Sequence, residues 1–327
     1  MKTRRLGPFE VSAIGLGCMN LSHAYGEPPT PEQGRAVLMR ALDGGMTLFD
    51  TAALYGFGRN EQLLGEVLAA HRERFVLASK CGMHGVNGQR VIDGRPATIR
   101  ESVEASLQRL RCEVIDLLYL HRLDPAVPIE DSVGAMADLV REGKVRALGL
   151  SEVSAATLRR AHAVHPIAAL QSEYSLWTRN PEIAVLQACR ELGTTLVAFS
   201  PLGRGFLGGR LREVQGLHDK DIRRSMPRFS PELFAHNLRL LPAFEAEAAA
   251  LHATPAQLAL AWLLAQGEDI IPIPGTTQLA HLEELLVADV LQLSPLVRER
   301  VGALIHPSAV AGARYNAATQ REIDTEE

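Results

Sequence analysis

The sequence contains little cysteine and no long hydrophobic run. Four of its 327 residues are cysteines, and none of them forms a C-x-x-C pair. So few cysteines in so long a chain exclude a disulfide framework and predict reduced, mostly buried thiols. No apolar stretch reaches membrane-spanning length, and no apolar signal core follows the basic residues 1–6. We therefore expect a cytoplasmic protein that does not act at a membrane.

An excess of charge of one sign is also missing. The chain has 34 Lys and Arg against 38 Asp and Glu, a net charge of −4, which does not predict a nucleic-acid partner. Hydrophobic residues make up 46% of the chain, enough for a large core. No linker-like segment divides the sequence, so we predict one domain over residues 1–327. The sequence leaves the oligomeric state open.

Short apolar runs alternate with helical patterns along most of the chain. The expected strands are residues 14–18, 46–49, 74–79, 114–120, 145–150, 167–171, 194–199 and 270–273. The expected helices are residues 31–44, 60–70, 97–110, 130–142, 154–164, 181–192 and 254–266. This alternation is typical of parallel βαβ units, and eight strands favour a closed (β/α)8 TIM barrel.

Three regions depart from this alternation. Residues 6–11, with Gly7-Pro8 at the turn, predict an N-terminal hairpin that caps the bottom of the barrel. Strands seven and eight are separated by residues 200–270, whose Gly-, Arg- and Pro-rich first half predicts a long loop over the active-site face. The polar tail, residues 306–327, is expected either to be mobile or to fold over that face.

Four ionisable residues fall at or just after predicted strand ends: Asp50, Tyr55, Lys80 and His121. In a (β/α)8 barrel these ends share the face that carries the active site. A Lys80 ammonium would lower the pKa of a nearby tyrosine, which is about 10 when unperturbed. Asp50 can hold that ammonium, and His121 can orient a carbonyl oxygen. The set suits proton delivery to a forming alkoxide, with electrons supplied by a cofactor.

Each of these residues also has a structural explanation when it is taken alone. Asp50 is equally well read as a helix cap, Tyr55 as a packing residue and His121 as a structural histidine. Lys80 is harder to explain in this way, because lysine is rarely buried without a partner. The four residues together, in this order, favour a catalytic site.

Six segments carry a resemblance to the aldo-keto reductase superfamily, and together they are highly specific. They are residues 49–56 (FDTAALYG), 78–80 (ASK), 118–122 (LYLHR), 170–175 (LQSEYS), 199–203 (FSPLG) and 273–276 (IPGT). The likeness runs from residue 3 to residue 305 and is greatest to the branch of microbial pyridoxal reductase-like and perakine reductase-like enzymes. It implies NAD(P)H-dependent reduction of aldehydes or ketones, with a small-molecule carbonyl substrate and NADPH bound without a Rossmann domain. Tyr55 would be the general acid of the tetrad.

The resemblance also implies the residues that bind the cofactor. Tyr174 would stack on the nicotinamide, while Ser151 and Gln171 would bind its carboxamide. The other expected cofactor residues are Ser200, Pro201, Leu202, Gly203, Arg204, Gly275, Thr276, Thr277, Glu283 and Glu284. An apolar substrate wall is expected from Met19, Tyr25, Phe57, Met83 and Leu123, which suits aromatic or medium-chain carbonyl compounds. No metal is expected.

Some positions depart from the family pattern. Glu152 stands where many relatives have Asn, and Leu285 replaces an Asn that often reads adenine. Thr277-Gln278 stands where NADPH-specific relatives carry Lys or Arg, which weakens recognition of a 2′-phosphate. NADPH stays the first choice, with NADH or dual use left open, because Thr277, His281 or a loop arginine can compensate.

Other motifs are open to two interpretations. Residues 203–208 satisfy G-x-G-x-x-G, but Pro201 and the lack of a following helix favour a phosphate-covering loop over a dinucleotide fingerprint. His162-x-x-His165 is read as a solvated helix end rather than as a metal site. Cys81 is read as a packed residue rather than as a reactive thiol.

The charged loop segment leaves a choice that the sequence does not decide. Arg223, Arg224 and Arg228 would either clamp a phosphate or an acidic substrate, or remain solvated.

Two other classes of function compete with a reductase. One is a nicotinamide-binding regulatory subunit that senses redox state without significant turnover. The other is a phosphate-binding barrel isomerase, which the fold alone would allow. Turnover of a carbonyl compound would distinguish a reductase from the regulatory subunit. Binding of a nicotinamide cofactor would distinguish it from the isomerase.

Overall fold

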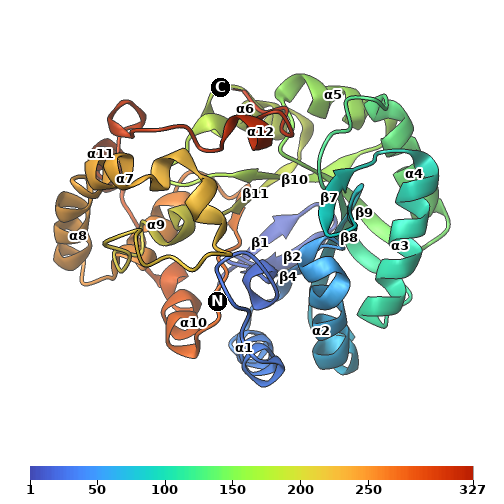
Figure 1. Ribbon diagram of the computed structural model, residues 1–327, viewed down its shortest axis with the longest axis horizontal. Helices are drawn as coiled ribbons and strands as arrows, with labels where there is room; N and C mark the ends of the chain where they lie inside the picture. Colours follow the sequence, from blue (N-terminus) through green and yellow to red (C-terminus); the bar gives the residue numbers. More distant parts are fainter. Residues whose placement is uncertain (327) are drawn as a thin grey trace.

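The computed structural model describes residues 1–326 and contains a closed parallel barrel (Figure 1). Its strands are β3 (Leu16–Gly17), β4 (Leu48–Asp50), β5 (Val76–Cys81), β8 (Ile115–Leu120), β9 (Val145–Ser151), β10 (Ile167–Glu173), β11 (Thr195–Phe199) and β12 (Ile270–Pro272). They pair in parallel in this order. Backbone amides of Gly15 and Gly17 donate to the carbonyls of Pro272 and Pro274, both at 3.0 Å, and so join the first strand to the last. The predicted (β/α)8 barrel is confirmed.

The barrel interior is filled with apolar side chains. Leu48, Leu117 and Val197 contribute to this inner cluster. Leu6 and Val11, from the hairpin of β1 (Thr3–Leu6) and β2 (Phe9–Ser12), complete it from below. Both residues are fully buried, so the predicted hairpin closes the bottom of the barrel. The opposite end, where the strands finish, is therefore the one that remains for a site.

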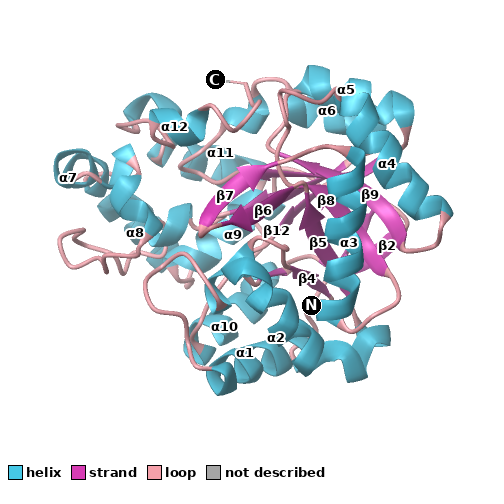
Figure 2. Ribbon diagram, turned by 45° about the vertical axis from the view of Figure 1, so that its right-hand side comes forward, coloured by secondary structure: helices cyan, strands magenta, loops and turns pink. Residues whose placement is uncertain are grey.

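Helices surround the barrel (Figure 2). They are α1 (Pro31–Asp43), α2 (Arg59–Leu68), α3 (Pro96–Leu110), α4 (Ile129–Arg141), α5 (Ala155–Val164), α6 (Val185–Leu192), α7 (Pro231–Leu238), α8 (Leu241–Ala250), α9 (Pro255–Leu264), α10 (Leu279–Leu286), α11 (Pro295–Leu304) and α12 (Ala317–Gln320). Thr254 caps α9 in a reciprocal capping box with Gln257, and Pro255 occupies the first helical position. The predicted start of the sixth helix at Pro181 is wrong, because residues 180–182 form a separate 3-10 turn before α6.

The long connection between β11 and β12 contains more helix than expected. Its first half consists of loops and short 3-10 turns over the strand ends, as predicted. Its second half holds α7 and α8 before α9, and the first two were not predicted. Ser230 caps α7 through Leu233, with Pro231 at the first helical position, and this was the sequence signal for that helix.

A second hairpin was also missed. Strands β6 (Met83–Val86) and β7 (Gln89–Ile92) pair in antiparallel fashion just after β5. Asn87 and Gly88 join them with φ values of +51° and +78°. Positive φ at both central residues is typical of a type I′ turn, and Asn-Gly is its strongest sequence signal.

The C-terminal tail is ordered and lies over the strand ends. The backbone amide of Asp324 donates to the carbonyl of Glu152 at 3.0 Å, and the Asp324 carboxylate accepts from the hydroxyl of Ser154 at 2.9 Å. Of the two expectations for the tail, folding over the active-site face is the one observed. Within residues 1–326, no helix is long and apolar enough to cross a membrane.

Candidate active site

Asp50 and Lys80 form a buried ion pair at the C-terminal ends of β4 and β5. The Lys80 ammonium donates to Asp50 Oδ1, and also to the carbonyl of Thr51 at 2.8 Å. The other carboxylate oxygen of Asp50 accepts from Gln171 Nε2 at 2.7 Å. Both members of the pair are almost fully buried, so their hydrogen bonds fix the position of the ammonium.

Tyr55 and His121 lie beside this pair. Tyr55 begins the 3-10 turn Tyr55–Gly58, and the Lys80 nitrogen lies 4.9 Å from its ring centroid. His121 directly follows β8, and its ring meets that of Tyr55 edge to face at 5.8 Å between centroids. The structure thus brings all four predicted residues together, although they come from two strands, the position after a third strand and a 3-10 turn.

The electrostatics of Tyr55 differ from expectation. Burial raises the pKa of Tyr55 above its ordinary value, and the Lys80 charge offsets only part of that rise. The predicted net lowering is therefore wrong, while the direction of the Lys80 effect is as expected. Burial also acts to lower the pKa of Lys80, but Asp50 and Tyr55 outweigh it and raise that pKa. At neutral pH the tyrosine is therefore protonated and the lysine is charged.

His121 is neutral at physiological pH. Burial holds the pKa of His121 well below its usual range, and the charges of Arg122, Lys80 and Arg90 lower it further. A neutral imidazole still carries one N–H donor. His121 can therefore donate a hydrogen bond to an oxygen without being a cation.

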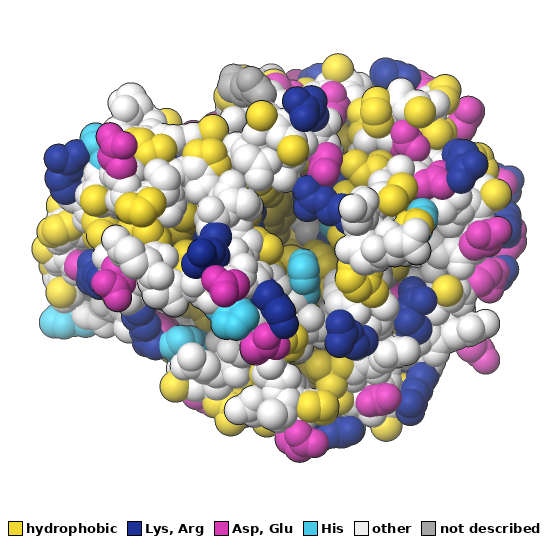
Figure 3. Space-filling model, viewed as in Figure 1, with side chains coloured by type: hydrophobic (Ala, Val, Ile, Leu, Met, Phe, Trp, Pro, Cys, Tyr) yellow, Lys and Arg dark blue, Asp and Glu magenta, His cyan; other side chains and the backbone are white. Residues whose placement is uncertain are grey.

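A cavity of about 1200 Å³ opens at this face, and Asp50, Tyr55 and His121 line it. Figure 3 shows the hollow near the centre of the molecule, with Lys and Arg side chains at its rim. The neighbouring strands β9, β10, β11 and β12 each contribute to the lining, through residues near their C-terminal ends. Two side chains of the lining, Asn20 and His121, have buried polar atoms without a hydrogen-bond partner among the described residues. The cavity therefore offers unfilled polar groups to a ligand.

Most of the predicted cofactor residues line this cavity. They are Ser151, Gln171, Ser200, Pro201, Leu202, Arg204, Gly275, Thr276, Thr277 and Glu284. Gly203 and Glu283 do not. The Gly203 amide is used within its own turn, donating to Ser200 at 2.9 Å, and Glu283 pairs on the surface with Arg40 at 2.6 Å.

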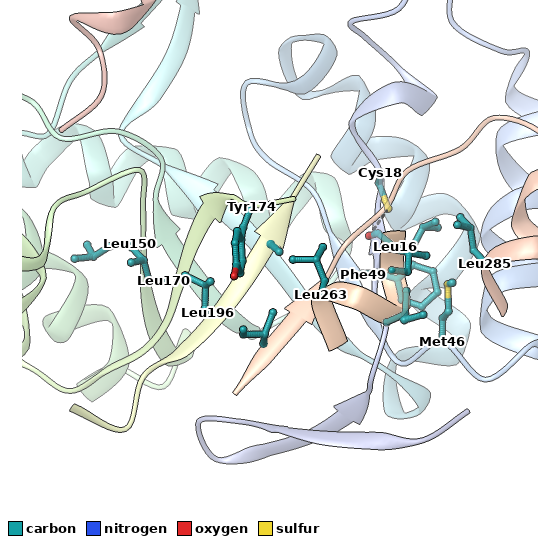
Figure 4. Packing of buried hydrophobic residues seen from close by; sticks show 14 of the residues in the cluster. Leu16, Cys18, Met46, Phe49, Leu150, Leu170, Tyr174, Leu196, Leu263 and Leu285 are labelled. Atoms are coloured by element: carbon teal, nitrogen blue, oxygen red, sulfur yellow. Dashed lines mark hydrogen bonds between the residues drawn. The ribbon is translucent and has the colours of Figure 1, made fainter. Parts of the chain in front are cut away.

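Tyr174 does not lie in the cavity, contrary to the prediction. Its side chain is 0% exposed and packs in the core beside Leu170 and Leu196 (Figure 4). Its hydroxyl donates to Glu182 at 2.8 Å, so its ring has no free face for a nicotinamide. Phe199, the last residue of β11, lines the cavity instead. The neighbouring motif Phe-Ser-Pro-Leu-Gly was the available signal for this aromatic residue.

The part of the cavity where the sequence predicted an apolar substrate wall is more polar than expected. Met19, Tyr25 and Met83 line it as predicted, but Phe57 and Leu123 do not. Phe57 lies 56% exposed against Gly85, and Leu123 packs against the core. The lining that the sequence did not predict comes from four places: His23 in the loop before α1, Arg90 of the β6–β7 hairpin, Arg122 directly after His121, and the tail residues Asn316, Thr319 and Glu322.

A buried charge cluster ties the tail to the cavity. Arg314 pairs with Glu152 at 2.7 Å, and Arg204 pairs with Glu173 at 2.7 Å. Glu152 therefore anchors the tail. This is a structural role for the carboxylate at the position where many relatives have Asn. Because Glu173 already balances Arg204, that arginine has little net charge to offer a phosphate.

The three loop arginines have three different roles. Arg223 lines the cavity, pairs with Asp221 at 2.6 Å and lies 5.0 Å over the ring of Tyr25. Arg224 lies on the surface, in agreement with the interpretation that it remains solvated. Arg228 is a structural residue, donating to the carbonyl of Trp177 at 2.6 Å. Of the three, Arg223 can act on a ligand of the cavity.

Two alternative sites find no support. The Cys81 thiol is buried and its pKa is raised to about 12, so it packs rather than reacts. His162 Nδ1 lies 3.3 Å from the amide of Ile167. Across the part of the chain that the structure describes, no group of His, Cys, Asp and Glu has a metal-binding arrangement.

Comparison with known proteins decides the family. The model of the aldo/keto reductase family matches residues 13–305, nearly the whole chain. The chain belongs to the aldo/keto reductase family. The more specific branch suggested by the sequence motifs stays a prediction.

Relatives of this aldo/keto reductase match over most of their length. A probable aldo-keto reductase 1 of Glycine max is 44% identical over 310 residues, which cover 94% of this chain and 89% of that protein. The aldo-keto reductase yakc of Schizosaccharomyces pombe, whose name specifies NADP(+), is 43% identical over 320 residues, covering 96% and 94%.

Solved structures agree in fold with this aldo/keto reductase. A glycerol dehydrogenase from Gluconobacter oxydans superimposes with a TM-score of 0.86 at 30% identity, covering 93% of this chain and 94% of the other. An aldo/keto reductase from Klebsiella pneumoniae, solved with NADP and acetate, superimposes with a TM-score of 0.74 at 27% identity, covering 96% and 99%.

Proposed function

We propose that this aldo/keto reductase reduces aldehydes or ketones to alcohols with NADPH, and that Tyr55 donates the proton. The observation that carries the proposal is the cluster of Tyr55, Asp50 and His121 on the wall of one large cavity, with the buried Lys80 ammonium bonded to Asp50 behind them. The cluster supplies hydrogen-bond donors for a carbonyl oxygen, and a bound cofactor would supply the electrons.

The cavity lining fits an extended nicotinamide dinucleotide. Ser151, the last residue of β9, and Gln171, near the end of β10, offer polar groups beside the tetrad. Phe199 on the next strand offers an aromatic side chain against which a flat ring can pack. Residues 200–205 follow in a turn with several positive φ values, where backbone amides can face phosphate oxygens.

The adenosine end of the cavity contains a cation and a histidine of its own. Arg210 from the long loop and His281 from α10 line the cavity together with Thr277. Arg210 pairs with Glu284 at 3.2 Å, but its side chain is 61% exposed, so this pair can open to a ligand more easily than the buried pair of Arg204 and Glu173. Burial and the charge of Arg210 lower the pKa of His281. We assign recognition of the 2′-phosphate to Arg210, assisted by His281. These two residues replace the Lys or Arg that Thr277-Gln278 lacks.

The proposed mechanism follows from the state of each side chain. When bound, NADPH supplies a hydride to the carbonyl carbon. His121, neutral and carrying one N–H, holds the carbonyl oxygen by a hydrogen bond. Tyr55 gives its proton to that oxygen as negative charge develops on it. Lys80 stabilises the resulting phenolate, and Asp50 holds the Lys80 ammonium in place.

Spectrophotometry of NADPH oxidation tests this function. We expect NADPH absorbance to fall in the presence of 4-nitrobenzaldehyde, phenanthrenequinone or pyridoxal, and not without a carbonyl compound. Tight NADPH binding with no turnover of any of them would contradict the reductase and favour a redox-sensing subunit. Failure to bind either nicotinamide cofactor would contradict both.

A further inference from the structure

The cavity beside His121 contains a guanidinium that no carboxylate balances. Arg122, the residue after His121, lines the cavity and is partly buried. One of its nitrogens donates to the carbonyl of His121 at 2.7 Å and to the hydroxyl of Ser151 at 3.1 Å. Among the described residues, it has no carboxylate within ion-pair distance. Its remaining N–H groups are therefore available to a ligand.

The other arginines of the cavity differ from Arg122 in this respect. Arg204 pairs with Glu173, Arg210 with Glu284, and Arg223 with Asp221. Each of those charges is balanced by the fold itself. Arg122 has no such partner among the described residues, so an anionic ligand entering the cavity would not have to displace a carboxylate to bind it.

A second guanidinium faces the same part of the cavity. Arg90 belongs to β7 of the hairpin over the barrel face, and its charge reaches His121. Arg90 pairs with Glu322 of the tail at 2.7 Å and donates to Thr319 at 3.1 Å. The side chains of this pair are 47% and 27% exposed, so it can rearrange at low cost when a ligand enters.

Arg122 and Arg90 both lie near His121. Arg122 is next to it in sequence, and the charges of both arginines help to lower the pKa of His121, which lines the same cavity as Tyr55. A guanidinium fork matches the two oxygens of a carboxylate and forms charge-assisted hydrogen bonds with them. An anionic group bound there would sit close to a carbonyl held by His121.

We propose that the carbonyl compound reduced at this site carries a carboxylate, which Arg122 binds with Arg90 beside it. The proposal rests on the proposed reductase function and names its substrate class. It replaces the apolar substrate wall expected from the sequence with a pocket that is apolar at Met19 and Met83 and cationic at Arg122 and Arg90. The product would be the corresponding hydroxy acid.

A pair of aldehydes that differ in one charge tests the substrate class. We would measure kcat/KM for 4-carboxybenzaldehyde and for its neutral ester, methyl 4-formylbenzoate, at saturating NADPH. The ratio of acid to ester should be about tenfold or more in the parent, the size expected for a hydrogen bond to a charged group. Arg122→Gln should bring that ratio close to one. An equal ratio in the parent and in Arg122→Gln would overturn the proposal.

Two further variants keep the test decisive. Glu322→Gln removes the carboxylate that competes for Arg90, so the acid-to-ester ratio should rise severalfold. An unchanged or lower ratio in this variant would overturn the proposal even if Arg122→Gln does not fold. Arg210→Gln, at the far end of the cavity, should leave the ratio unchanged while it weakens NADPH binding.

A binding measurement separates a substrate role of Arg122 from a cofactor role. Calorimetry on the NADP(+) complex should detect benzoate but not benzamide, and Arg122→Gln should weaken benzoate binding about tenfold or more. If Arg122→Gln instead weakens NADPH binding and leaves benzoate binding unchanged, Arg122 serves the cofactor and the proposal fails. Absence of turnover with both aldehydes would contradict the reductase function, whereas turnover of both with unchanged ratios would contradict the substrate class alone.

Discussion

At the scale of single residues, a few well-placed charges determine what the cavity can do. Asp50, Lys80 and His121 were identifiable from the sequence because each lies at the end of a short apolar strand. Tyr55 was identifiable through its order relative to them. Their protonation states were not predictable, since they depend on burial, and burial outweighs the Lys80 charge at Tyr55.

The aromatic residue of the cofactor site was assigned wrongly for a related reason. Tyr174 directly follows β10 and Phe199 is the last residue of β11, and the amide of Tyr174 donates to the carbonyl of Phe199 at 3.4 Å. Which of two neighbouring rings faces the cavity depends on packing against Trp262, which is far away in the sequence. Local sequence does not encode that choice.

Arg210→Gln tests cofactor choice at the residue scale. The variant should weaken NADPH binding about tenfold or more and change NADH binding little, because only NADPH presents a 2′-phosphate to this side chain. Fluorescence titrations with both cofactors measure the change in selectivity. Equal weakening of both would show that Arg210 does not read the phosphate. Arg224→Gln, on the surface of the same loop, is the matched control.

At the scale of elements, the alternation of strands and helices was predictable, but the additions to the barrel were less so. The Asn87-Gly88 turn signal was present and was overlooked, so β6 and β7 were missed. The position of the tail was not predictable from its own sequence, because it depends on ion pairs of Arg314 with Glu152 and Glu173, which lie on other elements. Short polar segments lack the periodicity that reveals an element.

The tail should contribute substantially to stability through Arg314. Arg314→Met removes one partner of a buried ion pair and leaves Glu152 uncompensated in the interior. The free energy of unfolding should fall by about 3 kcal/mol or more, a typical cost of breaking such a pair. Urea denaturation measures it.

An exposed ion pair provides the control for that change. Arg141→Met breaks a pair with Asp138 on the outside of α4, and it should cost less than about 1 kcal/mol. Equal losses in the two variants would contradict the structural role assigned to Arg314.

At the scale of the whole molecule, the barrel brings together side chains that are far apart in the sequence. Asp50 and Gln171 are separated by 121 positions yet share a hydrogen bond. The closed fold was predictable because eight apolar runs alternate with helices. The polar substrate end was not, since it combines a hairpin, a strand end and a tail.

The pH dependence of stability tests the burial of His121 in the intact fold. The folded-state pKa of His121 lies below its unfolded value. As the pH falls, His121 therefore binds a proton in the unfolded chain before it does so in the folded protein. The stability from this group is therefore present above about pH 6.5 and is lost as the pH falls, by up to about 1.4 kcal/mol per pH unit.

His121→Gln should consequently make the loss of unfolding free energy between pH 7 and pH 5 smaller than in the parent. Urea denaturation at the two pH values gives the difference. Replacing the exposed His252 with Asn should leave the difference as in the parent. An identical pH dependence in His121→Gln and the parent would show that His121 is not held neutral by the fold.

The central claim is that Tyr55 delivers the proton in NADPH-dependent carbonyl reduction. It is tested most directly by single-turnover kinetics of the NADPH-loaded Tyr55→Phe variant with 4-nitrobenzaldehyde, alongside an NADPH titration. The account predicts a reduction rate at least about a hundredfold below that of the parent, the usual contribution of a general acid, with NADPH affinity retained. Undiminished turnover in Tyr55→Phe would contradict it.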